Sequence, residues 1–119
     1  MNSTQLIELF EQMQQLEDAL GGDGDNLRVY CRTCGGCVVA VTTETDEIGK
    51  RRINLICSEP GKVVKGQDVN ELIELLEYSQ RSWGSNLRAY CQNCESYVAG
   101  VTLEADENGN RRITFTVSE

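Results

Sequence analysis

The amino-acid sequence predicts an α+β fold built as a tandem duplication, in which each copy is a helix followed by a three-stranded antiparallel sheet. The first observation is a repeat: residues 26–59 match residues 86–119 without a gap, and 18 of these 34 positions are identical. The second is that the apolar pattern within each copy changes from helical spacing to the alternation of strands. We expect the helices to pack on one face of the sheet.

Both helices are indicated by apolar residues at three- and four-residue spacing. The first is expected from about Thr4 to Leu20, where two glycines follow and would end it. The second is expected from about Asp68, a good N-cap with Glu71 three residues on, to about Ser79. The segment from Glu71 repeats the segment from Gln5 almost residue for residue, so the duplication includes the helix. The apolar stripe of the first helix comprises Leu6, Leu9, Phe10, Met13, Leu16 and Leu20.

Three strands are expected in the first copy, over Leu27–Cys31, Cys37–Thr43 and Arg51–Cys57, with equivalents in the second. Alternate residues of the longer strands are apolar, which predicts one face turned toward the helices and one toward water. The residues expected on the inner face are Val39, Val41, Ile53, Leu55 and Cys57 in the first copy, and Ala99, Val101, Leu103, Ile113, Phe115 and Val117 in the second.

The turn between the last two strands of each copy sets their register. In the second copy, Asp106–Gly109 predicts a type I turn whose glycine takes the left-handed conformation. This register places Glu44 opposite Arg52, and Glu104 opposite Arg112, as cross-strand ion pairs. Arg51 and Arg111, which precede these arginines, have no partner in the register, and Trp83 is expected to cover an edge of the core.

Length and composition favour one compact domain, residues 1–119, made of a first repeat (1–60) and a second (61–119). Each half alone, with about sixty residues, would be marginally stable. The only proline, Pro60, lies at the junction. No apolar run reaches the roughly 18 residues of a membrane span, and Met1–Leu20 is acidic and helix-patterned, unlike a signal peptide. We therefore expect a cytoplasmic protein with no membrane contact.

The charge of the chain indicates what it would bind. Nineteen acidic against eleven basic residues give a net charge of -8, and the first basic residue is Arg28. An acidic N-terminal helix opposes binding to nucleic-acid phosphates, which is driven by Lys and Arg contacts. A protein partner with a basic surface is therefore expected rather than direct nucleic-acid contact, for a chain that is a monomer or a homodimer. The alternative, which the composition favours more, is a solvated acidic helix face that only keeps the protein soluble.

Each repeat contains one Cys-x-x-Cys loop: Cys31 with Cys34, and Cys91 with Cys94. Two thiolates in a tight loop between strands can chelate one metal ion at about 2.3 Å. The chain has no histidine, so a closed structural zinc site needs further thiolates. We predict zinc as the cofactor.

Two ligand sets satisfy this requirement. In one, Cys31, Cys34, Cys91 and Cys94 hold a single zinc that joins the repeats. In the other, Cys37 and Cys57 complete a local site with the first loop, but they correspond to Tyr97 and Val117 in the second copy. Because only the loop cysteines recur, the duplication favours the shared site. Cys37 and Cys57 are then buried apolar residues.

Other thiol chemistry stays open at this point. A redox pair of the thioredoxin kind lies where a strand meets a helix that lowers a thiol pKa, whereas here each pair lies between two strands. Four thiolates can also ligate an iron–sulfur cluster, and the thiols could simply be free.

The loop Cys31-Arg32-Thr33-Cys34-Gly35-Gly36 resembles the zinc knuckles of zinc-ribbon proteins. The resemblance covers only the Cys-x-x-Cys hairpins and departs from the ribbon pattern at Cys94-Glu95, where the usual glycine is missing. It implies metal binding and favours zinc over an iron–sulfur cluster, but it implies no biological process.

The sequence favours a non-enzymatic interaction or regulatory protein. It has no histidine, no nucleophile motif and no glycine-rich phosphate loop, and a closed four-thiolate zinc leaves no open position for a substrate. One alternative is an acidic, nucleic-acid-mimicking inhibitor, such as a phage-encoded one directed against a nucleic-acid-binding defence protein. Another is a thiol–disulfide redox protein, which would need one reactive, low-pKa cysteine.

Overall fold

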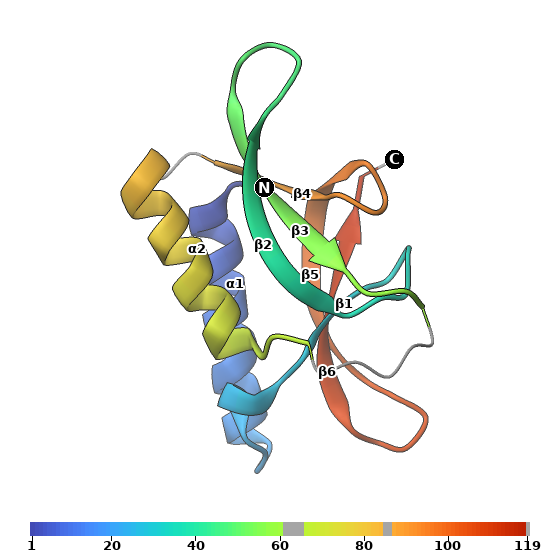
Figure 1. Ribbon diagram of the computed structural model, residues 1–119. Helices are drawn as coiled ribbons and strands as arrows, with labels where there is room; N and C mark the ends of the chain where they lie inside the picture. The colour runs from blue at the N-terminus through green and yellow to red at the C-terminus, as the bar shows by residue number, and fades with distance from the viewer. Residues whose placement is uncertain (61–65, 85–86, 119) are drawn as a thin grey trace.

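The computed structural model describes residues 1–60, 66–84 and 87–118 and shows a mixed α+β fold with two helices and a six-stranded sheet (Figure 1). The prediction of an α+β fold is confirmed. Residues 61–65, which include part of the predicted junction, lie outside the described residues. The elements are α1 (Ser3–Ala19), a short 3-10 turn η1 (Gly24–Asn26), β1 (Val29–Cys31), β2 (Val38–Thr45), β3 (Arg51–Cys57), α2 (Val69–Trp83), β4 (Arg88–Cys91), β5 (Ser96–Ala105) and β6 (Arg111–Val117).

Both helices begin with a capping box. The side chain of Asn2 accepts a hydrogen bond from the Gln5 backbone N–H at 2.9 Å, and that of Asp68 accepts one from the Glu71 N–H at 2.8 Å. The helix starts therefore agree with prediction, but α2 continues four residues past Ser79. In the predicted stripe of α1, the two leucines nearest its C-terminus, Leu16 and Leu20, are exposed. No helix in residues 1–60, 66–84 or 87–118 is long and apolar enough to cross a membrane.

The six strands form one sheet in the order β1-β6-β5-β4-β3-β2. The hairpins β2–β3 and β5–β6 are antiparallel, but β1 pairs in parallel with β6 and β4 in parallel with β3. The prediction of two separate three-stranded antiparallel sheets is therefore wrong. β1 adds to the hairpin of the other half, whereas β4 lies between the halves and pairs antiparallel with β5 of its own hairpin and parallel with β3 of the other. Alternating apolar residues show that a segment is a strand but do not show which strand it pairs with. Because the two hairpins are similar, their edges are equivalent partners for the first strand of either half.

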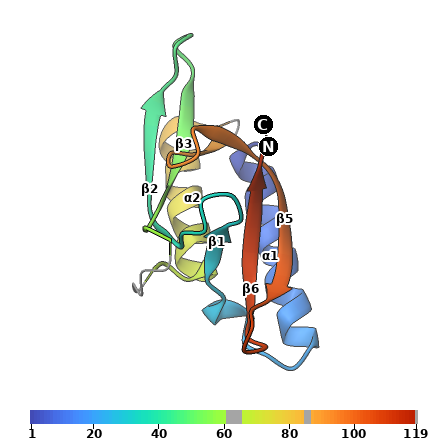
Figure 2. The ribbon, with the colours of Figure 1, turned by 90° about the vertical axis from the view of Figure 1, so that its right-hand side faces the viewer.

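The helices are exchanged in the same way. α1 packs against β4, β5 and β6, whereas α2 packs against β2 and β3. The two helices lie side by side and run in opposite directions (Figures 1 and 2). They do not cover one face of a three-stranded sheet as expected. Each completes a unit with the hairpin of the opposite half, and residues of both halves form one apolar core.

A β-bulge near the start of each hairpin changes which residues face the core. The register shifts between Val38 and Ala40, and at the equivalent place between Val98 and Gly100. Val38 and Val98 are consequently buried, whereas Ala99 is exposed, so its predicted inward position is wrong. Val39 is half-buried. Beyond the bulge, Ile53, Leu55, Ile113 and Phe115 are fully buried as predicted. Asn54 and Thr114 between them are buried too, so the predicted water-facing side is wrong in the middle of β3 and β6.

The hairpin turns and one of the two predicted ion pairs are confirmed. Gly49 and Gly109 have φ of 84° and 82°, and each donates its N–H to the aspartate that begins its turn. The Arg52 Nε donates to Glu44 Oε1 at 3.0 Å. The predicted ion pair between Glu104 and Arg112 in the second half is wrong, because Glu104 pairs with Arg32 instead. Its register partner, Arg112, stacks over the Tyr30 ring at 4.3 Å.

The two arginines for which the hairpin register predicted no ion-pair partner, Arg51 and Arg111, meet the ends of the helices. Arg111 forms an ion pair with Glu17 at the end of α1. Arg51 stacks over the ring of Trp83 at the end of α2, 3.5 Å from the ring centroid. Trp83 is 53% exposed and does not close the core as predicted. Both contacts join a helix of one half to a strand of the other.

Candidate metal centre

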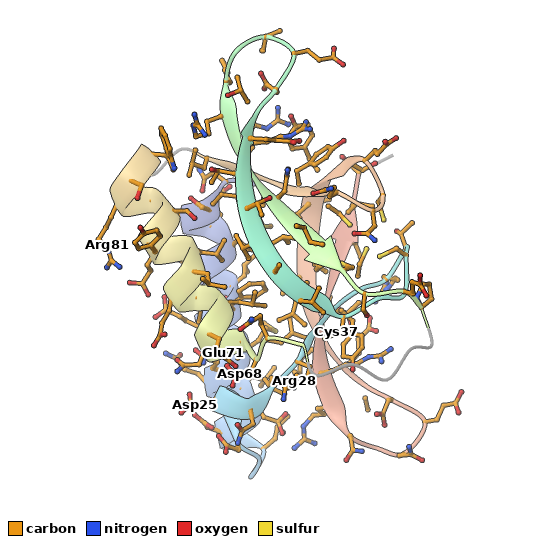
Figure 3. All side chains as sticks on the ribbon, viewed as in Figure 1. Asp25, Arg28, Cys37, Asp68, Glu71 and Arg81 are labelled. Atoms are coloured by element: carbon orange, nitrogen blue, oxygen red, sulfur yellow. The ribbon has the colours of Figure 1, made fainter. Side chains whose placement is uncertain are left out.

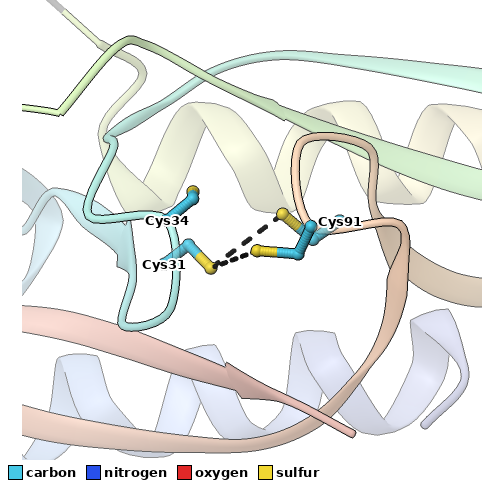
Figure 4. Close-up of side chains that lie close together, drawn as sticks. Cys31, Cys34 and Cys91 are labelled. Carbon is cyan, nitrogen blue, oxygen red and sulfur yellow. Dashed lines mark hydrogen bonds between the residues drawn. The ribbon is translucent and has the colours of Figure 1, made fainter. Parts of the chain in front are cut away.

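The two Cys-x-x-Cys loops face each other at the ends of β1 and β4 (Figure 4). Each of these short strands ends at the first cysteine of its loop, Cys31 or Cys91. Both cysteines are buried, whereas the second cysteine of each loop, Cys34 or Cys94, is half-buried. The fold therefore brings together two loops that are sixty residues apart in the chain.

The four sulfur atoms of these loops all lie within 4.8 Å of one another. The Sγ of Cys31 is 3.5 Å from that of Cys94 and 3.9 Å from that of Cys91. Four thiolates bound to one tetrahedral ion at about 2.3 Å would be separated by about 3.8 Å. The cluster could therefore hold a metal ion with little movement of its side chains.

Backbone N–H groups inside the loops favour the ionised form of the buried thiols. The Cys34 N–H bonds to the Cys31 sulfur and the Cys94 N–H to the Cys91 sulfur, and both contacts lower the pKa of the acceptor. Burial nevertheless raises the pKa of Cys31 to about 11. The pKa of Cys91 is lowered to about 5, chiefly by a hydrogen bond from the thiol of Cys57. Cys91 is consequently the first of the two to ionise.

Cys57 borders the cluster without belonging to it. The pKa of Cys57 is raised, first because its S–H group donates a hydrogen bond to the sulfur of Cys91 and second because it is buried. Its backbone is held by the side chain of Asn93, in the second loop: the Cys57 N–H donates to Asn93 Oδ1 at 2.9 Å, and Asn93 Nδ2 donates to the Cys57 carbonyl at 3.1 Å. This clamp was not predictable from the sequence, because Asn93 has Thr33 as its counterpart and no pattern links it to β3.

Cys37 lies outside the cluster. Its Sγ is 3.8 Å from the carbonyl oxygen of Val38, and a Cβ added to Gly66 would meet that Sγ at 2.4 Å. Burial raises the pKa of Cys37, partly offset by the charge of Arg28. The local set that would combine Cys37 and Cys57 with the first loop is not assembled among the residues that the structure describes.

Both loops adopt the same backbone turn although only one has glycine there. Gly35 has φ of 75°, and Glu95, at the equivalent position, has φ of 53°. Glu95 is the only non-glycine residue with positive φ in the described part of the chain. The second loop thus keeps the left-handed backbone at this position although it lacks the glycine of the zinc-ribbon pattern. Glu95 adds strain of about 1–2 kcal/mol there.

Two tyrosines brace the second loop. Tyr90 and Tyr97 flank it and pair across β4 and β5, with ring centroids 5.0 Å apart in an edge-to-face arrangement. The guanidinium of Arg52 lies over Tyr90 at 3.7 Å, and that of Arg88 over Tyr97 at 3.8 Å. This arginine–tyrosine stack fixes the base of the loop that carries Cys91, and its residues line a hollow of about 590 Å³ below the β2–β3 turn.

No protein-family model, curated protein or solved structure matches this chain.

Proposed function

We propose that this chain is a small acidic, non-enzymatic interaction protein in which one zinc ion, bound by Cys31, Cys34, Cys91 and Cys94, joins the two halves. The observation that supports it best is the approach of the four loop sulfurs to within 4.8 Å of one another. Two similar loops, one from each half, supply the four ligands. The ion would therefore act as a cross-link between halves that share one core.

A site made only of thiolates favours zinc in a structural role. Four protein ligands complete a tetrahedron and leave no position for water or a substrate. The N–H bonds to Cys31 and Cys91 would stabilise the negative charge that remains on bound thiolates. Iron also accepts four thiolates, so the test of the proposal has to identify the bound metal as well as detect it.

The charge of the surface supports a basic protein partner. The chain carries a net charge of -8, and exposed acidic residues of α1, among them Glu8, Glu11 and Asp18, are followed by no basic residue before Arg28. Oppositely charged surfaces accelerate encounter and select the partner. The acidic surface would serve for contact, while the metal would hold the fold that displays it.

The test is native mass spectrometry with elemental analysis of protein purified under reducing conditions. We expect one zinc per chain, lost on chelation together with much of the folded structure. Cys91→Ser and Cys94→Ser should both lose the metal, whereas Cys37→Ser, which lies outside the cluster, should keep it. Zinc retained by Cys91→Ser, or no metal in the wild-type protein, would overturn the proposed site.

Thiol–disulfide chemistry is the second candidate, because the Sγ atoms of Cys31 and Cys94 are 3.5 Å apart and Cys91 has a lowered pKa. Alkylation of the metal-free protein distinguishes the two functions. One rapidly modified cysteine that zinc does not protect would favour the redox function, whereas protection of the loop cysteines by zinc would favour the structural site.

A further inference from the structure

The duplication allows α1 and α2 to be compared position by position. Aligned through their shared heptapeptide, Gln12 corresponds to Tyr78 and Glu17 to Trp83, while Leu9 corresponds to Leu75. On α2 these side chains are exposed: Leu75 by 37%, Tyr78 by 64% and Trp83 by 53%. At two of these three positions α2 therefore exposes an aromatic side chain where α1 has a polar one.

The fold itself does not require these aromatic side chains. α1 occupies the equivalent place with Gln12 and Glu17, and its end is held by the Glu17–Arg111 ion pair where α2 has Trp83 over Arg51. Exposed aromatic residues of this kind are enriched in binding surfaces and rare elsewhere. Their presence on one helix alone points to a role in contact.

Two adjoining hollows along α2 form a groove, and the first of them borders β2. A hollow of about 280 Å³ is lined by strand residues 41–43 and by Leu75, Ser79 and the aromatic pair Tyr78 and Trp83. A second hollow of about 370 Å³ continues from Leu75 and Tyr78 toward the start of α2, where Glu71 and Glu74 line it. Arg81 is the basic residue of that lining, at the other end of the helix (Figure 3).

β2 is the outer strand beside this groove. It ends the strand order of the sheet, and β3 is its only strand neighbour from Ala40 to Thr45 among the described residues. An open strand edge offers backbone donors and acceptors to an added strand. Beyond Thr45 the hairpin turn continues with Asp46 and Glu47, so carboxylates lie at both ends of the edge.

We propose that an extended segment of a partner protein, with alternating basic and apolar residues, adds to the edge of β2 and lies in the groove against α2. Its apolar side chains would contact Leu75, Tyr78 and Trp83. Its basic side chains would meet Glu71 and Glu74 at one end and the acidic turn at the other. This deepens the proposed function by naming the contact surface, and it rests on that function only in taking the partner to be a basic protein.

The probe is a short synthetic peptide that alternates lysine and valine, titrated into zinc-loaded, isotopically labelled protein and followed by amide NMR shifts. We expect shifts in residues 40–45 of β2 and in the indole N–H of Trp83. The variants Tyr78→Gln and Trp83→Glu copy the first half and should fold, since Glu at 83 can pair with Arg51 as Glu17 pairs with Arg111. Each should weaken binding by about tenfold.

Matched controls test the chemistry of the partner. A peptide with glutamate in place of lysine should not bind, and proline at its centre should abolish binding by removing a backbone donor. Gln12→Ala, in the equivalent hollow between α1 and β5, should leave affinity unchanged. Equal binding of the acidic peptide, or shifts confined to other surfaces, would overturn the proposal. So would self-association of the protein that Tyr78→Gln abolishes, because the face would then be a contact with a second copy.

The outcomes separate this inference from the metal proposal. Zinc bound as expected with no peptide binding would reject the groove alone. Peptide binding at β2 by a protein that holds no zinc would reject the metal site alone.

Discussion

Gly35 and Glu95 occupy equivalent positions directly after the second cysteine of each loop, and both have a left-handed backbone, with φ of 75° and 53°. Glycine adopts this conformation freely, whereas a residue with a Cβ is strained in it. Both loops thus have a left-handed residue after the second cysteine, but only in the second loop is that residue strained.

Replacement of Glu95 by glycine should therefore stabilise the protein by about 1 kcal/mol, because the strain in the second loop is relieved. The reverse change, Gly35→Glu, should destabilise it by a similar amount, since the nearest atom to an added Cβ, on Pro60, is at an ordinary contact distance of 3.5 Å. Urea unfolding of the zinc-loaded variants measures both effects. A less stable Glu95→Gly variant would show that the carboxylate makes a favourable contact that outweighs the strain.

The arginines that begin β3 and β6 should differ in importance. Arg111 pairs with Glu17, whose side chain is only 8% exposed, so Arg111→Ala leaves a buried carboxylate unpaired and should lower stability more than Arg51→Ala does. Arg51 stacks on an exposed Trp83, and Arg51→Ala should cost about 1 kcal/mol or less. Thermal or urea unfolding of the two variants gives the comparison. Equal losses would contradict it.

Zinc binding should release fewer than four protons at neutral pH. The pKa of Cys91 is lowered to about 5, so this ligand is already a thiolate, whereas Cys31, with its pKa raised to about 11, must lose a proton to bind. Apparent affinity should consequently rise with pH throughout the interval from about 5 to about 11 that separates these two pKa values. Calorimetric titration in two buffers with different ionisation enthalpies counts the protons. Release of four would show that Cys91 is protonated in the metal-free protein.

The exchange of strands predicts that neither half folds alone as a monomer. A chain of residues 1–60 would keep the β2–β3 hairpin but lose β4 and α2, which pair with and cover it. We expect poor amide dispersion for each half, and recovery of the native spectrum when residues 1–60 and 61–119 are mixed with zinc. A monomeric, well-dispersed spectrum from residues 1–60 alone would contradict the exchanged pairing.

Local features of the chain were predictable because they depend on neighbours in sequence. The capping residue Asp68, the turn glycine Gly109 and the register of Glu44 with Arg52 all follow from short-range geometry. The bulges near Val38 and Val98 were missed because a bulge shifts the phase of the alternation, and residues 38–41 and 98–101 are all apolar or glycine, so the shift cannot be seen there.

The sequence by itself determined the mixed α+β elements, the two equivalent loops and the four cysteines that come together. It did so because the duplication separates the recurring Cys31, Cys34, Cys91 and Cys94 from Cys37 and Cys57, which do not recur. Only the tertiary structure decided that β1 joins β6, that β4 joins β3 and that each helix covers the opposite hairpin. Two similar halves offer equivalent edges and faces, so the choice between pairing within and between them depends on how the whole core packs.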